Sequence, residues 1–198
     1  RQFGSAAEHI QALRKQAADT GLASALAAYV ALVEGRHENA FADLQAAGQR
    51  IGRRPVVRGM LAAYHMTQGT WREAAEQLDA LPQTADSADA DSDGARCWVD
   101  VTLGSPEMVR LHQIRAWVML GDDEQAQRHV EALRGTKWEP HAWAMQAGCL
   151  WASRRRQEAN EVLQQARQAF PDDLPLAQLA MLFLLGEGHP AEAESLVR

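Results

Sequence analysis

The sequence contains only two cysteines, Cys97 and Cys149, and very little lysine, which occurs only at Lys15 and Lys137. The cysteines stand at no metal-ligand spacing, so we expect small buried hydrophobic residues, with a disulfide as the alternative. Runs of β-branched and aromatic residues, which strands need, are missing as well. Alanine, leucine, glutamine, glutamate and arginine dominate instead, and these are strong helix formers. The composition therefore predicts a helical protein with almost no sheet.

Long hydrophobic runs and an excess of positive charge are also absent. The longest apolar candidate, Leu179 to Leu185, is far shorter than the roughly 18 residues that cross a bilayer, so no transmembrane segment is predicted. The formal net charge of −6 argues against a nucleic-acid partner, because such surfaces are normally basic. The excess of arginine over lysine, with the richness in alanine, is typical of a GC-rich bacterial genome. The cellular compartment stays open between cytoplasm and periplasm or envelope.

No catalytic constellation is found either. There is no nucleophile elbow, no phosphate-binding loop and no His-x-x-x-His pair that places two ligands on one helix face. The seven histidines are scattered along the chain: His9, His37, His65, His112, His129, His141 and His189. We therefore predict that the protein is not an enzyme and uses no cofactor or catalytic metal.

What the sequence does contain is a repeat of 34 residues. Small residues recur at this interval, each followed four positions later by an apolar residue, first at Ala6, Ala40 and Ala74 and then, after one interruption, at Ala126, Ala159 and Ala193. A period of this length is typical of solenoids, in which each unit buries its faces against its neighbours. The pattern begins and ends halfway through a unit, which predicts that the chain is a fragment and that stacking continues beyond both ends.

Each unit is expected to form two helices joined by a tight turn, and the turn has its own signature. Glycine precedes the repeated alanine at Gly35, Gly69, Gly121 and Gly188, whereas Arg154 takes this place in the remaining unit. Glycine is favoured there because helices often end in a left-handed residue, a conformation that costs a residue with a side chain about 1 kcal/mol or more.

These residues resemble the tetratricopeptide repeat (TPR) family. The family pattern is most complete in the unit that begins at His141, where the matching positions hold Trp143, Ala147, Leu150, Ala159, Leu163, Ala166 and Pro171. Gln113 and Gln146 depart from it, because a large apolar residue is usual there. The resemblance implies an all-α fold, a right-handed superhelix (TPR solenoid) of about five helix-turn-helix repeats plus a leading half repeat, in a single domain over 1–198. Trp71, Trp117 and Trp143 fall on core positions of the repeat, with a ligand-stacking role as the alternative.

In this family, partners usually lie in a concave groove lined by the first helix of each pair. Transferred position by position, the resemblance implies a partner-binding groove formed by Leu22, Tyr29, Leu32, Val56, Met66, Met108, Leu111, Arg115, His141, Trp151, Leu182 and Leu185. This lining is mostly apolar and lacks the lysine, arginine and asparagine set with which chaperone-binding members hold a carboxylate. It suits an apolar segment of a protein or peptide partner, although some of these side chains could simply cover neighbouring helices.

The predicted function is therefore a protein-interaction scaffold or adaptor within a larger bacterial assembly, such as one for envelope biogenesis, export or secretion. The alternative is a regulatory module that senses a peptide or small ligand and is attached to another domain of a longer chain. Self-association into a homo-oligomer is a third possibility.

Two further segments stand outside the repeat pattern. An inserted acidic loop is expected at about 82–104. Its Asp89, Asp91, Asp93 and Asp100 have the spacing of a calcium loop. A plain solvated loop is favoured, because Asp replaces the usual final Glu and no helix pair flanks the segment. Basic residues cluster at Arg50, Arg53, Arg54 and Arg58 and again at 154–156. Both clusters are interpreted as solvated turns, with contact to an acidic partner as the alternative.

Overall fold

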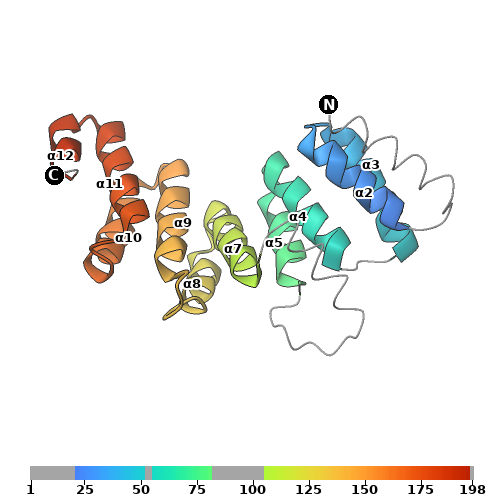
Figure 1. The fold of residues 1–198 in the computed structure, drawn as a ribbon, viewed down its shortest axis with the longest axis horizontal. Helices are drawn as coiled ribbons and strands as arrows, with labels where there is room; N and C mark the ends of the chain where they lie inside the picture. The colour runs from blue at the N-terminus through green and yellow to red at the C-terminus, as the bar shows by residue number, and fades with distance from the viewer. Residues whose placement is uncertain (1–20, 52–54, 82–104, 197–198) are drawn as a thin grey trace. The chain divides into compact units, whose positions relative to one another are not determined.

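The computed structural model describes residues 21–51, 55–81 and 105–196, and these ranges contain helices joined by short turns and no β-strand. The prediction of an all-helical protein is thus confirmed for the described residues. The helices, in chain order, are α2 (Gly21–Val33), α3 (His37–Ile51), α4 (Pro55–Gln68), α5 (Trp71–Asp79), α7 (Pro106–Leu120), α8 (Asp123–Glu131), α9 (Glu139–Ala152), α10 (Arg156–Ala169), α11 (Leu174–Glu187) and α12 (Pro190–Ser195) (Figure 1).

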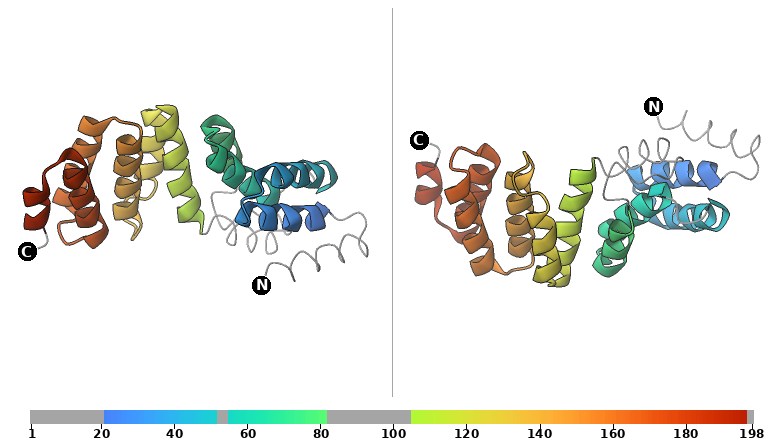
Figure 2. Two further views of the ribbon diagram at one scale, coloured as in Figure 1. Left: turned by 90° about the horizontal axis from the view of Figure 1, so that it is seen from above. Right: turned by 90° about the horizontal axis from the view of Figure 1, so that it is seen from below.

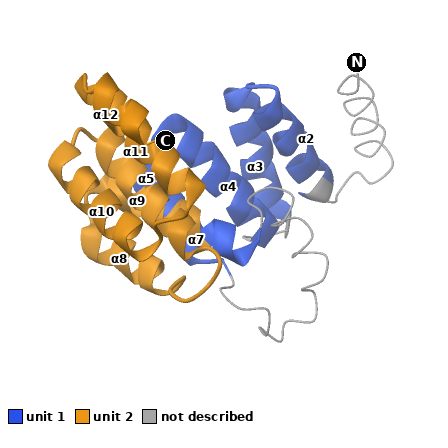
Figure 3. Cartoon of the chain, turned by 60° about the vertical axis from the view of Figure 1, so that its left-hand side comes forward, with its two compact units in different colours: residues 1–109 blue, residues 110–198 orange. Residues whose placement is uncertain are grey.

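The chain divides into two compact units, residues 1–109 and residues 110–198 (Figure 3). In unit 1, α2 packs against α3 and α4, and α4 packs against α5. The core of this unit is a continuous cluster from three helices, formed by Ala25, Ala28, Leu44, Ala47, Val56, Val57 and Met60. Small residues on α2 and α3 let the helix backbones approach closely, while Val57 and Met60 of α4 fill the space between them.

In unit 2, helices α8 to α12 pack against their neighbours in the chain. Helix α9 contacts α8, α10 and α11, and α11 also contacts α10 and α12. Figure 2 shows the same succession of α9, α10, α11 and α12 from two further sides. Buried large side chains in this unit include Ile114, Val130, Leu133, Leu163 and Leu176. Since α9 and α11 touch, the first helices of two successive pairs lie next to each other.

The turn after each first helix has one repeated geometry. A residue with positive φ ends each helix: Gly35 (74°), Gly69 (72°), Gly121 (78°), Arg154 (63°) and Gly188 (84°). The next N–H donates to a carbonyl five residues back, for example from Asp122 to Trp117 at 3.0 Å, which is the bonding of a Schellman motif. The turn positions predicted from sequence are confirmed, including the substitution at 154: Arg154 is the one non-glycine residue with positive φ in the described part of the chain.

The repeated alanines occupy equivalent places in the second helices. Five of them lie in described helices and are almost completely buried, with exposed fractions of 2% or less: Ala40, Ala74, Ala126, Ala159 and Ala193. Each N–H also closes the first hydrogen bond of its helix, as Ala126 does by donating to the carbonyl oxygen of Asp122 at 3.1 Å. Because these alanines are buried, a larger side chain at the same position would overpack its surroundings.

Local signals explain where several helices begin. The carboxylate of Asp122 accepts a hydrogen bond from the backbone N–H of Gln125 at 3.1 Å, and that of Asp173 accepts one from Leu176 at 2.9 Å. Both are side-chain caps of a helix N-terminus. Pro140, Pro175 and Pro190 stand in the first turns of α9, α11 and α12, where a missing N–H costs nothing.

Several predictions concern residues outside the described ranges. These are the leading half repeat around Ala6, the acidic insert at 82–104 with its calcium-loop aspartates, and Cys97. The arrangement of all pairs as one superhelical domain over 1–198 stays a prediction. Gln113 and Gln146, which depart from the repeat pattern, are buried with exposed fractions of 0% and 7%.

Candidate interaction surface

The predicted groove residues of α2 and α4 differ in exposure. Tyr29 is half-buried and packs against the core cluster of unit 1, and Leu32 and Met66 are also half-buried. Val56 is a member of that cluster, with an exposed fraction of 6%, so it offers no surface to a partner. Leu22 lies in α2, but its side chain is outside the described part of the structure.

The predicted groove residues of α7, α9 and α11 include the most exposed members of the set. Leu111 is buried at 3% and belongs to the core, and Met108 is half-buried. Arg115 and His141 are exposed, the latter with its ring edge against Trp138 at 5.3 Å between centroids. The exposed set also includes two leucines of α11, Leu182 at 59% and Leu185 at 49%.

Trp151 links the first helices α9 and α11. Its ring stacks on Phe183 of α11, with centroids 4.1 Å apart and planes 11° apart. A Cβ added to Gly186 would lie 3.0 Å from Cζ2 of Trp151, so the indole occupies space that a side chain at 186 would need. Leu182 and Leu185 immediately precede Phe183 and Gly186, and their row on the helix surface is therefore next to the row that Trp151 covers. Three of the predicted groove residues thus lie on two helices that are in contact.

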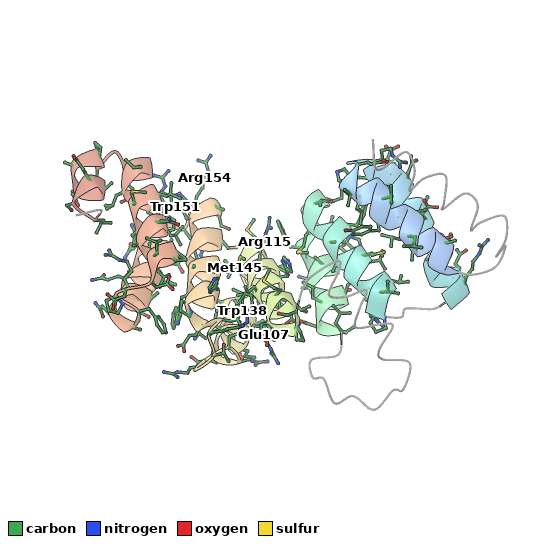
Figure 4. The ribbon with its side chains drawn as sticks, viewed as in Figure 1. Glu107, Arg115, Trp138, Met145, Trp151 and Arg154 are labelled. Carbon is green, nitrogen blue, oxygen red and sulfur yellow. The ribbon has the colours of Figure 1, made fainter. Side chains whose placement is uncertain are left out.

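The three successive arginines after α9 have different environments. Arg155 donates two hydrogen bonds to Asp123 of α8, at 2.8 and 2.6 Å, and is also paired with Glu158 of α10. The hydrogen bonds from Arg155 lower the pKa of both carboxyl groups. Arg156 instead places its guanidinium over the ring of Trp151, 5.0 Å from the centroid, and Arg154 is exposed in its left-handed turn. Figure 4 shows Trp151 and Arg154 near the same end of α9.

Polar and sulfur-containing side chains lie between α7 and α9. Ser153 donates a hydrogen bond to the sulfur of Met119 at 3.3 Å, and the thiol of Cys149 faces the sulfur of Met145 at 3.9 Å. Figure 4 places Met145 and Arg115 on this side of α9. Burial raises the pKa of Cys149 to about 11, although the charge of Arg115 acts in the opposite direction. The thiol is therefore protonated at neutral pH and is a poor nucleophile or metal ligand.

Cys149 is a free, buried cysteine, as the sequence predicted for a small hydrophobic residue. The described residues hold no group of three or more histidine, cysteine or acidic side chains that could bind a metal ion. Trp71, Trp117 and Trp143, expected in the core, are half-buried. None of the helices described is both long enough and apolar enough to traverse a bilayer.

Sequence reasoning missed Phe183 and Gly186, which together position Trp151. Phe183 belongs to the same apolar run as the leucines, so its identity alone does not show which side of α11 packs inward. A signal was nevertheless available in α11, whose sequence is apolar around the whole helix. Leu176, Ala180 and Phe183 are buried, and a helix that buries one side only must expose leucines on another. Leu174, 65% exposed at the first position of α11, is a further example.

Comparison with known proteins finds no family model that matches the chain and no characterised protein with significant sequence similarity.

Proposed function

We propose that the chain is a TPR-type helical solenoid that acts as a scaffold, binding an apolar segment of a partner protein on the face formed by its first helices. The observation that carries the proposal is the exposure of Leu182 and Leu185 beside Trp151. Large apolar side chains in water are a source of binding free energy, about 25 cal/mol per Å² of apolar surface removed from water.

The family assignment within this proposal is supported by the repeated turns. Five first helices end in the same left-handed turn, and a buried alanine follows each turn five residues later. This regularity is what a stack of helix pairs requires, because every pair must present the same small residue where its helices cross.

The form of the partner follows from the shape of the exposed row. Leu182 and Leu185 are spaced by three residues on one helix and therefore form a short ridge. A partner helix with apolar residues at positions i, i+3, i+4 and i+7 matches such a ridge, and so does an extended segment with two apolar side chains. Near the ridge, Trp151 stacks on Phe183 and has the guanidinium of Arg156 over its ring.

Selection from a random peptide library displayed on phage tests this function with the intact chain. The wild-type protein is expected to enrich peptides rich in apolar residues, and the double variant Leu182→Asp, Leu185→Asp is expected to lose them. Leu174→Asp is the matched control, because Leu174 is at least as exposed, lies on the same helix and stands outside the predicted groove.

Failure of the wild-type chain to enrich any peptide would refute the proposal. Equal loss of binding in Leu174→Asp would refute the location of the site. Light scattering on the same three proteins separates partner binding from self-association, since a homo-oligomer held by this ridge would lose mass in the double variant.

A further inference from the structure

The first helices of unit 2 have a one-sided distribution of charge. Helix α7 has Glu107 in its first turn and carries Arg110 and Arg115 further along, with no other carboxylate. The acidic residues of α9 and α11 stand only at the helix limits: Glu139 begins α9 and accepts a hydrogen bond from the N–H of Gly135, while Glu187 ends α11 and accepts one from Asn160.

The second helices carry most of the acidic residues that lie in the helices of this unit. Helices α8 and α10 include Asp123, Glu124, Glu131, Glu158 and Glu161. The chain is acidic as a whole, with a formal net charge of −6, yet α7, α9 and α11 each carry a single carboxylate, near one end of the helix. The turn from α9 to α10 and the first residue of α10 add three successive arginines, at 154–156.

Two of these arginines are available to a partner. Arg155 is neutralised by Asp123 and Glu158, but Arg154 and Arg156 are exposed and form no ion pair within the described residues. The guanidinium of Arg156 lies over the ring of Trp151, 5.0 Å from the centroid, and the side chain is exposed. An exposed guanidinium without an ion-pair partner can donate two parallel hydrogen bonds to a carboxylate.

The backbone at Arg154 supports the same conclusion. The four equivalent turns have glycine, whereas here an arginine is held at a φ of 63°. The hydrogen bonds of the turn do not require its side chain, because the backbone N–H groups of Arg154 and Arg155 make them, to Trp151 at 3.0 Å and to Leu150 at 2.9 Å. A strained residue whose side chain is not needed for the fold is typical of a binding position.

We infer that the segment bound beside Leu182 and Leu185 carries carboxylates next to its apolar side chains, and that Arg154 and Arg156 receive them. This inference rests on the proposed function and adds the charge of the partner to it. The occupant is a protein segment that combines leucine-like residues with aspartate or glutamate.

The peptides enriched by the wild-type chain provide the test. We expect them to combine apolar residues with aspartate or glutamate. Fluorescence polarisation with the most enriched peptide is expected to show about tenfold weaker binding to the double variant Arg154→Gly, Arg156→Gln, because charge-assisted hydrogen bonds are lost. The same loss is expected when the peptide's acidic residues are replaced by their amides. Arg128→Gln is the control for charge: it removes one positive charge from α8, where the double variant removes two near Trp151, and its binding should equal that of the wild type.

The outcomes separate the two levels of the proposal. Enriched peptides that are apolar but not acidic, and that bind the arginine double variant as tightly as the wild type, would overturn this inference while leaving the scaffold function in place. Equal weakening by Arg128→Gln would also overturn it, because the effect would then be one of net charge. No enrichment by the wild type would overturn both.

Discussion

Replacing Arg154 by glycine and by alanine measures the backbone strain in the turn after α9. Arg154 has a φ of 63°, and the backbone hydrogen bond from its N–H to Trp151 is kept by either replacement. Both variants remove the charge and the long side chain, so they differ only in the Cβ atom. Any difference in stability between them therefore reports the cost of a Cβ in the left-handed conformation.

The expected difference is worked from two opposing terms. A residue with a Cβ in the left-handed region costs about 1–2 kcal/mol. In the opposite direction, glycine lowers the free energy of unfolding by about 0.4–1 kcal/mol relative to alanine, because glycine gives the unfolded chain more conformational freedom. Arg154→Gly should thus be more stable than Arg154→Ala by about 1 kcal/mol, which corresponds to about 2–4 °C in melting temperature for a chain of this size.

Gly121 provides the reverse experiment. It has a φ of 78° in the equivalent turn, and a Cβ added there would meet no atom within 4 Å. Gly121→Ala should therefore destabilise the folded protein by about 1 kcal/mol, through backbone strain alone. Gly148 is the matched control, since it lies within α9 and also has no neighbour within 4 Å. Gly148→Ala should stabilise the protein by about 0.5–1 kcal/mol, because glycine is unfavourable inside a helix.

Urea unfolding followed by circular dichroism measures all four variants against the wild type, with comparison at constant m-value. The reasoning fails if Arg154→Ala is as stable as Arg154→Gly, because the turn would then not hold residue 154 in the left-handed region. It fails equally if alanine has the same sign of effect at 121 and at 148.

Three further outcomes are expected. Gly186→Ala should not give the stabilisation expected for Gly148→Ala, because the new Cβ displaces the indole of Trp151. A change in tryptophan fluorescence checks this displacement. An unchanged spectrum together with a gain in stability would contradict it. Arg155→Gln should destabilise the protein at pH 7 but not at low pH, because folding lowers the pKa of the two carboxyl groups that Arg155 contacts. Their contribution to stability is present above the pKa of about 4 that they have in the unfolded chain, and it is lost as the pH falls through their lower pKa in the folded protein. The urea midpoints of the wild type and Arg155→Gln at pH 7 and pH 2.5 test this prediction. A difference between the two proteins that persists at pH 2.5 would argue against the ion pair. Ala159→Leu should destabilise by about 1–3 kcal/mol through overpacking, and Gln164→Leu, at an exposed position of the same helix, is its control.

The repeat pattern determined the local structure without any tertiary information. Glycine at 35, 69, 121 and 188 marks helix ends because few other residues adopt the left-handed conformation, and the register placed Arg154 in the same role. The repeated alanines marked the buried side of each second helix for an equally local reason, since a helix pair leaves room only for a small residue at its crossing. Both signals depend on neighbouring residues in the chain, and sequence alone contains them.

The tertiary structure decided which positions of the first helices reach the surface. Val56 and Leu111 share the groove register with Leu182 and Leu185, yet the first two are buried and the last two exposed. The period cannot distinguish them, because the rotation of each helix is set by packing over its whole surface. The same holds for charge: the sequence shows three arginines at 154–156, and only their contacts show that Asp123 and Glu158 neutralise the middle one while Trp151 supports the next. Glu158 and Trp151 lie only three and five residues from the arginines that they contact. Asp123 lies on α8, 32 residues before Arg155, so their meeting is a product of helix packing rather than of local sequence.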